Sequence, residues 1–293
     1  MLQLKDGIHE NITNADYHAL PRVSNSDLTL FKSSPYDYYA WKLAEGRPVR
    51  KVTPAMERGT ALHMAVLEPD LFKATYVEAP PLDRRTKAWK EFAESVEGKE
   101  ILSAQEFAAN KIMSDQIRKI PIIKQVLGEA KKEVTALWAD EQTGLPCRAR
   151  PDMLSIALRM IFDIKTTAEL NYHAFSRSAI NYEYHRQRFW YSNGLNTLLG
   201  ATPEDGFDFC IVAVESSYPF KAGLFEFDED LYSIAADEIR SELEELKKCM
   251  ESGVWPTGLE GLNTIRAPEW MKKKIQKGFS YLSGDEENER PTD

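Results

Sequence analysis

One segment limits the possible folds of this chain more than any other: FDFCIVAVES, residues 207–216. Its apolar residues run on without polar alternation, which is typical of a strand covered on both faces of a sheet. Shorter β-rich runs are expected at 134–140, 147–155 and 160–167, and GLFEFDE (223–229) is expected to be an edge strand. Helical patterns surround these strands. Together they predict an α/β fold, with a central mixed β-sheet flanked by helices.

Several segments have the periodicity and end signals of helices. The longest is 230–250, where Leu231, Ile234, Ile239, Leu243 and Leu246 recur at helical spacing. Two capping boxes are expected, Ser24 with Asp27 and Ser103 with Glu106. Helices are predicted over 54–68, from Ser103 to near Pro121, over about 182–199 ending near Gly200, and over 230–250.

Composition excludes some classes of protein. There is no uncharged apolar run of about 18 residues, so no membrane span is expected, and the first residues lack the pattern of a secretory signal. Three widely separated cysteines indicate a reducing cytoplasm and lack the spacing of an iron–sulfur or zinc site. The net charge of −9 argues against a protein that coats nucleic acid, but a local basic channel can still bind a polyanion.

Two aspartates lie in or beside strands that are otherwise fit for a core. Asp152 ends the run RARPD, and Asp163 lies between Phe162 and Ile164. A buried carboxylate is costly unless it is paired or binds a cation. Lys165, two residues after Asp163, projects from the same face of the strand. The set favours Mg²⁺, with Mn²⁺ as an alternative, although a surface ion pair would give the same D-x-K pattern.

The surrounding motifs give this pattern more weight. They are SNSDLTLFKSSP (24–35), RGTALHMAVLEP (58–69), DRRTKAWK (83–90), RPDML (150–154), DIKTT (163–167), NYEYHRQRFWY (181–191) and a Trp-Pro at 255–256. In order and spacing they resemble the RecE-like exonuclease (exonuclease VIII) family of the PD-(D/E)xK nuclease superfamily, over roughly residues 10 to 275. The resemblance implies a restriction-endonuclease-like core. We therefore expect one nuclease domain over 1–283, with a helical part to about 130 and a catalytic sheet core over about 131–275, before a disordered acidic tail, 284–293.

The resemblance also implies roles for individual residues. Mg²⁺ would be bound by His63, Asp152, Asp163 and the main-chain carbonyl of Ile164, with Lys165 beside the attacking water. Gly59, one turn before His63, is expected to let its helix approach the sheet closely. Glu68 is either a weak supporting residue or a surface acid at the helix end.

Other positions are expected to contact DNA or the water network. Gln187 and Tyr191, at i and i+4, lie on one helical face and match a Q-x-x-x-Y element that lines the active site in this superfamily; a packed tyrosine beside a solvated glutamine is the alternative. His185 and Arg188 are candidate phosphate contacts. Arg84, Arg85 and Lys87 form a basic cluster that is either a DNA contact or an ordinary solvated surface.

Finally, the resemblance implies a function and partners. It implies an exonuclease, phage or prophage encoded, that degrades one strand of linear double-stranded DNA in the 5′-to-3′ direction and leaves 3′ overhangs for recombination. It also implies a RecT-type single-strand annealing partner and a ring-shaped homo-oligomer. The alternatives are a PD-(D/E)xK endonuclease, an iron–sulfur nuclease, which the cysteine pattern disfavours, and a non-catalytic DNA-end-binding protein.

Overall fold

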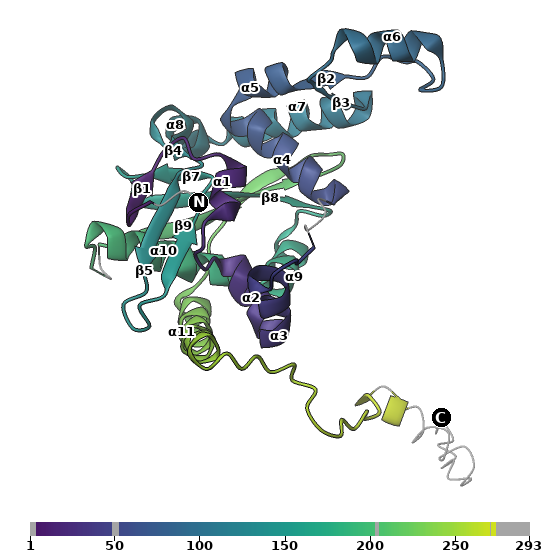
Figure 1. The fold of residues 1–293 in the computed structure, drawn as a ribbon. Coiled ribbons are helices and arrows are strands. Elements are labelled where there is room, and N and C mark those ends of the chain that lie inside the picture. The colour runs from purple at the N-terminus through teal and green to yellow at the C-terminus, as the bar shows by residue number, and fades with distance from the viewer. Residues whose placement is uncertain (1–3, 49–52, 203–204, 270, 274–293) are drawn as a thin grey trace, which may run out of the picture. The chain divides into compact units, whose positions relative to one another are not determined.

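The computed structural model describes residues 4–48, 53–202, 205–269 and 271–273, and divides the chain into two compact units, Met1–Trp255 and Pro256–Asp293 (Figure 1). In the second unit, the backbone amide and hydroxyl of Thr257 donate to the Glu260 carboxylate, at 2.6 and 3.0 Å. The predicted acidic tail, 284–293, lies outside the described residues. The expected domain limit at 283 stays a prediction.

The first unit is built on a five-stranded sheet in the order β10-β9-β8-β7-β4. Only β8 and β9 pair in parallel, and the other neighbours are antiparallel, so the sheet is mixed as predicted. Its strands are β4 (Lys131–Lys132), β7 (Met153–Ser155), β8 (Met160–Thr167), β9 (Asp208–Glu215) and β10 (Ala222–Phe225). A second sheet joins β1 (Gly7–His9), β5 (Thr135–Ala139) and β6 (Pro146–Ala149), and a third joins β2 (Tyr76–Glu78) to β3 (Glu100–Leu102).

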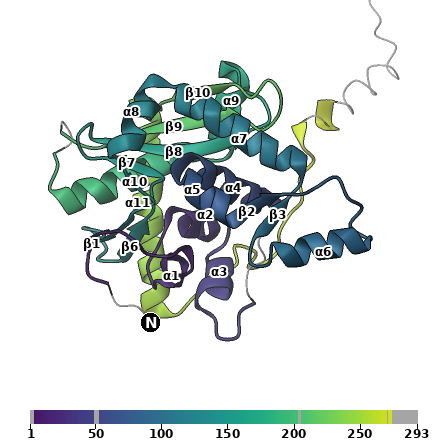
Figure 2. The ribbon, with the colours of Figure 1, turned by 90° about the horizontal axis from the view of Figure 1, so that it is seen from above.

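Helices cover both faces of the five-stranded sheet. Alternate residues of β8 enter different cores: Phe162 and Ile164 pack with α4, α7 and α8, whereas Ile161 packs with α9, α10 and α11. Figures 1 and 2 show α4 and α7 on one side of the strands and α10 and α11 on the other. By the two-residue period of a strand, Asp163 and Lys165 therefore project toward the α10 side. The helical elements are α1 (Asn14–Ala19), α2 (Asn25–Ser33), α3 (Pro35–Tyr38), the π-helix η1 (Tyr39–Leu43), α4 (Pro54–Leu67), α5 (Pro69–Thr75), α6 (Lys87–Ser95), α7 (Ala104–Lys119), α8 (Pro121–Glu129), α9 (Tyr172–Asn181), α10 (Tyr184–Leu199) and α11 (Glu229–Ser252).

Most of the predicted elements are confirmed. Both capping boxes form, and α10 ends at Gly200 in the left-handed region, with φ of 62°. β9 lies inside the sheet and β10 at its edge, as expected. In the described part of the chain no helix is long and apolar enough to cross a bilayer.

Two details of the prediction are wrong. The run 147–155 is not one strand, because it divides into β6 and β7, which belong to different sheets. Pro151 lies at the break, and its lack of an amide hydrogen is incompatible with continued strand pairing. Ile234 was assigned to the apolar face of α11 but is exposed, and Ala235 and Ala236 are buried there instead.

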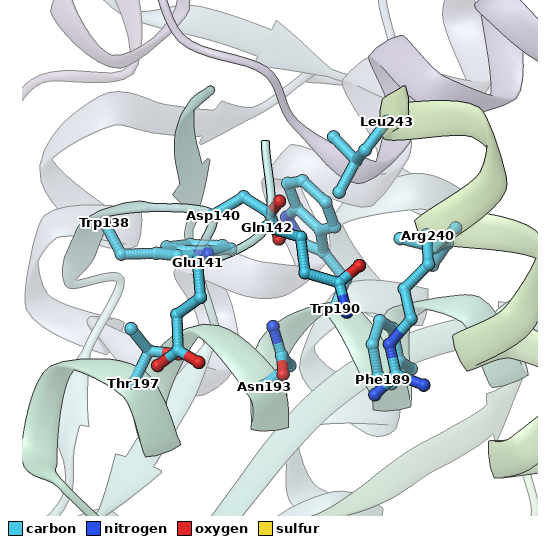
Figure 3. Close-up of a pocket in the computed structure, with 11 residues that line it drawn as sticks. Trp138, Asp140, Glu141, Gln142, Phe189, Trp190, Asn193, Thr197, Arg240 and Leu243 are labelled. Atoms are coloured by element: carbon cyan, nitrogen blue, oxygen red, sulfur yellow. The ribbon is translucent and has the colours of Figure 1, made fainter. Parts of the chain in front are cut away.

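A small cavity of about 40 Å³ lies where α10 passes β5 and α11 (Figure 3). Trp138 and Trp190 line it, and their rings pack with centroids 5.1 Å apart. This volume has room for only a few water molecules, since each needs at least about 10–15 Å³. It is a packing gap rather than a ligand site.

Gly194 of α10 makes a prediction possible. A Cβ at this position would lie 2.7 Å from two carbons of the buried Trp138 ring. We expect Gly194→Ala to lower the free energy of unfolding by about 1–3 kcal/mol, because an overpacked core must shift to accept the methyl group. Urea unfolding followed by tryptophan fluorescence measures this change.

Gly59 of α4 is the matched control, and it corrects the sequence analysis. A Cβ on Gly59 would meet no heavy atom within 4 Å, so this glycine does not serve a close helix–sheet approach. Gly59→Ala should be neutral or stabilise by up to about 1 kcal/mol through helix propensity. Equal stability of the two alanine variants would contradict the packing described for Gly194.

Candidate active site

The site forms where β7 ends beside the longer strand β8. On its β8 side, β7 pairs only with Met160, Ile161 and Phe162, and the chain before it contains Pro151 and Asp152. The edge of β8 facing Asp152 is thus left without a strand partner at Ile164. Because buried backbone groups need hydrogen-bond partners, side chains must take over this role.

Asp152 and His63 satisfy the backbone of Ile164. The Ile164 amide donates to Oδ2 of Asp152 at 2.6 Å, and Nε2 of His63 lies 3.1 Å from the Ile164 carbonyl oxygen. His63 comes from α4, and its Nδ1 is 3.1 Å from Oδ1 of Asp152. Three segments distant in sequence therefore meet at one point of β8.

Asp163 and Lys165, whose side chains project from β8 toward the α10 side, form an ion pair. Asp152 and Asp163 are both buried, with 7% and 3% of their surfaces exposed. The Lys165 ammonium also lies 5.1 Å from the centre of the Tyr184 ring, a cation–π contact from the start of α10. The predicted same-face placement of Asp163 and Lys165 is what brings these charges together.

The electrostatics fit a compact cluster of opposite charges. Burial lowers the pKa of His63, but the Asp152 carboxylate outweighs it and raises this pKa to about 9, so at neutral pH both ring nitrogens donate. Burial likewise opposes the charge of Asp152, yet His63 and Lys165 hold its pKa below the ordinary value. Burial raises the pKa of Asp163. The pKa of Lys165 is raised because Asp163 and Asp152 outweigh its burial, so this side chain is a cation and not a base.

The donor set of this cluster fits a hard divalent cation. Two carboxylates, one imidazole and the Ile164 carbonyl are oxygen and nitrogen ligands of the kind that Mg²⁺ and Mn²⁺ accept. Within the residues that the structure describes, no three His, Cys, Asp or Glu side chains are already grouped as metal ligands. Lys165 contacts Asp163 and His63 contacts Asp152, so the cationic side chains lie against the carboxylates.

Gln187 and Tyr191 lie beside this cluster on one face of α10, as their spacing predicts. The Tyr191 ring packs edge-on against Phe209 of β9, with ring centroids 5.9 Å apart, and Oε1 of Gln187 is buried without a hydrogen-bond partner among the described residues. Burial, with Asp163 nearby, raises the pKa of Tyr191 well above its ordinary value, so the phenol stays protonated. Their part in chemistry stays a prediction.

Other predicted residues are not brought to the cluster. His185 is buried, and its ring packs against Phe227 at 6.3 Å. Arg188 donates to the carbonyls of Phe227 and Asp228, at 2.9 and 2.8 Å, and pairs with Glu229. These two side chains join α10 to the segment before α11. Their polar groups are therefore not positioned to contact DNA phosphates.

The basic cluster Arg84, Arg85 and Lys87 is exposed and lies elsewhere, at the start of α6. Figure 2 shows this helix away from the five-stranded sheet. Arg85 pairs with Asp83 at 2.9 Å and Lys87 with Glu91 at 3.2 Å. Glu68, at the junction of α4 and α5, is exposed as well. These positions look like solvated surface, and no contact with the cluster around Ile164 is present among the described residues.

Tyr184 was missed by the sequence analysis, although it lies within the quoted motif 181–191. Its ring contacts the Lys165 ammonium, so it belongs to the site. The sequence contains two tyrosines here, at 182 and 184. Helix periodicity alone could not predict that the ring of Tyr184 contacts Lys165.

Comparisons with known proteins bear on the family and the fold of this chain. A family model described as "PDDEXK-like domain of unknown function (DUF3799)" matches residues 24–268. A solved structure of an exonuclease candidate from Eubacterium rectale has a similar fold, with a TM-score of 0.59 and 13% identity over 91% of this chain and 98% of that one. A phage-related exonuclease from Haemophilus somnus 129PT, also 13% identical over 80% of this chain and 96% of that one, has a TM-score of 0.34. No sequence match was found among curated proteins.

Proposed function

We propose a function in metal-dependent DNA hydrolysis for this chain, which belongs to the family of PDDEXK-like domains (DUF3799). One observation carries the proposal: Asp152 and His63 converge on the backbone of Ile164, next to the Asp163–Lys165 pair. That arrangement gathers oxygen and nitrogen ligands and a fixed cation where β8 extends beyond its pairing with β7. These are the groups that phosphodiester hydrolysis requires.

Each residue has a role in this proposal. His63, Asp152, Asp163 and the Ile164 carbonyl would hold Mg²⁺ or Mn²⁺, which supplies Lewis-acid stabilisation of phosphate charge and activation of water. Lys165 keeps its proton and donates from Nζ toward the negative charge that develops on the phosphate. Tyr184 and Asp163 hold this ammonium in place. Gln187 and Tyr191, one turn apart on α10, would line the site beside it.

The finer proposal is an exonuclease of the RecE-like type. Its substrate would be the end of linear double-stranded DNA, degraded 5′-to-3′ to leave a 3′ overhang for recombination. A RecT-type annealing protein would be its partner and a ring-shaped homo-oligomer its assembly. The resemblance of the sequence motifs supports these assignments. A closed ring would also retain DNA by topology despite a net charge of −9.

A cleavage experiment tests this function. The chain is incubated with Mg²⁺ and either end-labelled linear duplex or a covalently closed circle of the same sequence, and EDTA is added to a parallel sample. We expect release of the 5′ label from the linear duplex, an intact circle and no cleavage in EDTA. Equal cutting of the circle would instead establish an endonuclease. Binding of DNA ends without cleavage in Mg²⁺ or Mn²⁺ would identify a non-catalytic end-binding protein.

A further inference from the structure

A large groove adjoins the active site within the first unit. Its cavity volume is about 1220 Å³, and its walls come from α2, α3, η1, β6 and the start of α10. The volume exceeds the range of about 300–1,000 Å³ that is usual for small-molecule sites. Its size therefore indicates an extended ligand.

The groove is positively charged. Its lining contains Arg22, Lys42, Arg47 and Arg148 but only one carboxylate, Asp27. Three of these cations already have carboxylate partners: Lys42 and Arg148 lie 2.5 and 3.4 Å from the two oxygens of Asp27, and Arg22 lies 2.7 Å from Asp6. Arg47 has no carboxylate partner among the described residues, and in a chain with a net charge of −9 this local cation favours an anionic ligand.

Exposed aromatic rings line the same groove. Tyr182 is 69% exposed and stacks on Tyr184, with ring centroids 5.7 Å apart and planes 20° from parallel. Trp41 of η1, 45% exposed, also lines the groove. Open aromatic faces beside cations are the features by which proteins bind unpaired nucleic acid, because every base can stack on them.

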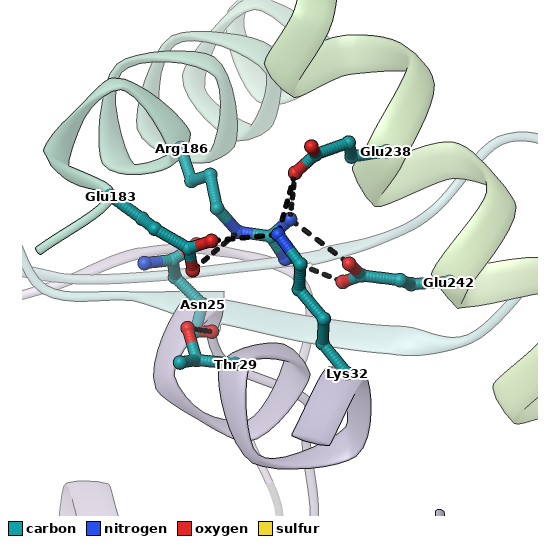
Figure 4. A network of polar contacts seen from close by, with 7 residues as sticks. All are labelled: Asn25, Thr29, Lys32, Glu183, Arg186, Glu238 and Glu242. Carbon is teal, nitrogen blue, oxygen red and sulfur yellow. Dashed lines mark hydrogen bonds and ion pairs between the residues drawn. The ribbon is translucent and has the colours of Figure 1, made fainter. Parts of the chain in front are cut away.

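Glu183 holds the Tyr182–Tyr184 pair in place. It lies between the two tyrosines, with φ of 54°, in the turn from α9 to α10. Its carboxylate is 2.6 Å from Lys32 of α2 and 3.9 Å from Arg186 of α10 (Figure 4). Arg186 in turn pairs with Glu238 of α11 at 2.8 Å. An uncommon backbone conformation is thus fixed by ion pairs to two other helices, which preorganises the stacked rings.

The groove continues into the active site. Tyr184 and Gln187 both line it. The Tyr184 ring contacts the Lys165 ammonium, and Gln187 lies one turn after Tyr184 on α10. A strand lying in the groove would therefore lead directly to the acidic cluster.

We propose that this groove binds single-stranded DNA, with a base stacked on Tyr182 and a backbone phosphate near Arg47. Arg47 suits this role, because among the described residues it bonds only the Ala44 carbonyl, at 3.1 Å, and pairs with no carboxylate. The inference deepens the proposed function and rests on it, since it names the state of the substrate beside the active site. The duplex would have to separate before its strand reaches Lys165.

Binding without cleavage tests this inference. Anisotropy of a fluorescein-labelled thymidine oligonucleotide is measured with the full chain in EDTA, for the wild type, Tyr182→Ala and Tyr182→Phe. Tyr182→Ala should bind the oligonucleotide about 5-fold or more weakly than the wild type, because one base loses its stacking partner. The affinity of Tyr182→Phe should stay within about 2-fold of the wild type. The matched control is Tyr172→Ala, because Tyr172 is 72% exposed, lies at the other end of α9 and is not part of the groove.

An abasic oligonucleotide of the same length separates stacking from a general loss of structure. Wild type and Tyr182→Ala should bind it equally, because no base is present to stack. Unchanged thymidine binding by Tyr182→Ala, an equal loss on the abasic strand, or tighter binding of RNA of the same sequence would overturn the inference. A wild type that cleaves duplex DNA but binds no oligonucleotide would refute the groove and leave the proposed function standing. A wild type that binds as expected but never cleaves would support the groove and refute the proposed function.

Discussion

Asp163→Asn should reduce cleavage of linear duplex DNA in Mg²⁺ by more than about 100-fold, since even changes to the outer partners of metal ligands commonly cost 10–100-fold. The substitution preserves the size of a buried side chain and removes its charge. Metal affinity and the placement of Lys165 both depend on that charge, because Lys165 pairs with this carboxylate. The initial rate of label release from end-labelled duplex measures the effect.

Asp70→Asn is the matched control for this variant. The Asp70 side chain is 98% exposed on α5 and pairs only with Lys73, at 3.4 Å, among the described residues. It should cleave at the wild-type rate. Circular dichroism of both variants verifies that the fold is intact, so that a loss of rate reports on the site. Cleavage by Asp163→Asn at a rate near that of Asp70→Asn would be incompatible with a role for Asp163 in the chemistry.

Arg186→Met should give the largest loss of stability. The Arg186 side chain is fully buried and pairs with Glu238 and Glu242 of α11, linking α10 to α11 (Figure 4). Removing one partner from a buried ion pair costs about 3–5 kcal/mol, because the remaining charge loses its compensation. We expect the lower end of that range, since Glu238 is 37% exposed and water will screen it. The free energy of unfolding in urea measures the change.

Two further variants make this result specific. Arg240→Met removes an exposed arginine of α11 that lies over the Phe189 ring at 5.4 Å, and should cost no more than about 1 kcal/mol. Adding Glu242→Gln to Arg186→Met should recover part of the loss, because the unpaired carboxylate is then gone. If Arg186→Met and Arg240→Met unfold at the same urea concentration, the network does not join the helices as described.

Local patterns in the sequence predicted much of the fold. Apolar continuity located β9, periodicity located α10 and α11, and the capping boxes located the starts of α2 and α7. The errors occurred where neighbours in space decide the outcome. Pro151 separates two strands into different sheets, and the orientation of α11 buries Ala235 and Ala236 while exposing Ile234.

The candidate site could be predicted only in part, for the same reason. The structure brings His63, Asp152, Asp163 and Lys165 together, and their assigned roles stay predictions. Helix periodicity predicted the face of α10 on which Arg188 lies. It could not predict that the Arg188 guanidinium donates to the carbonyls of Phe227 and Asp228. Tyr184, Arg186 and the groove depend on contacts between α2, α10 and α11, which no pattern within one segment encodes.

Binding of Mn²⁺ tests the central claim most directly, because the claim is that these side chains hold a divalent cation at the edge of β8. Electron paramagnetic resonance of free Mn²⁺ is followed during titration of the wild type, Asp163→Asn and Lys165→Met. The wild type and Lys165→Met should both take up the ion, since Lys165 is a cation and not a ligand, and Asp163→Asn should take up far less. Equal uptake by the wild type and Asp163→Asn, or no uptake by the wild type, would contradict the account.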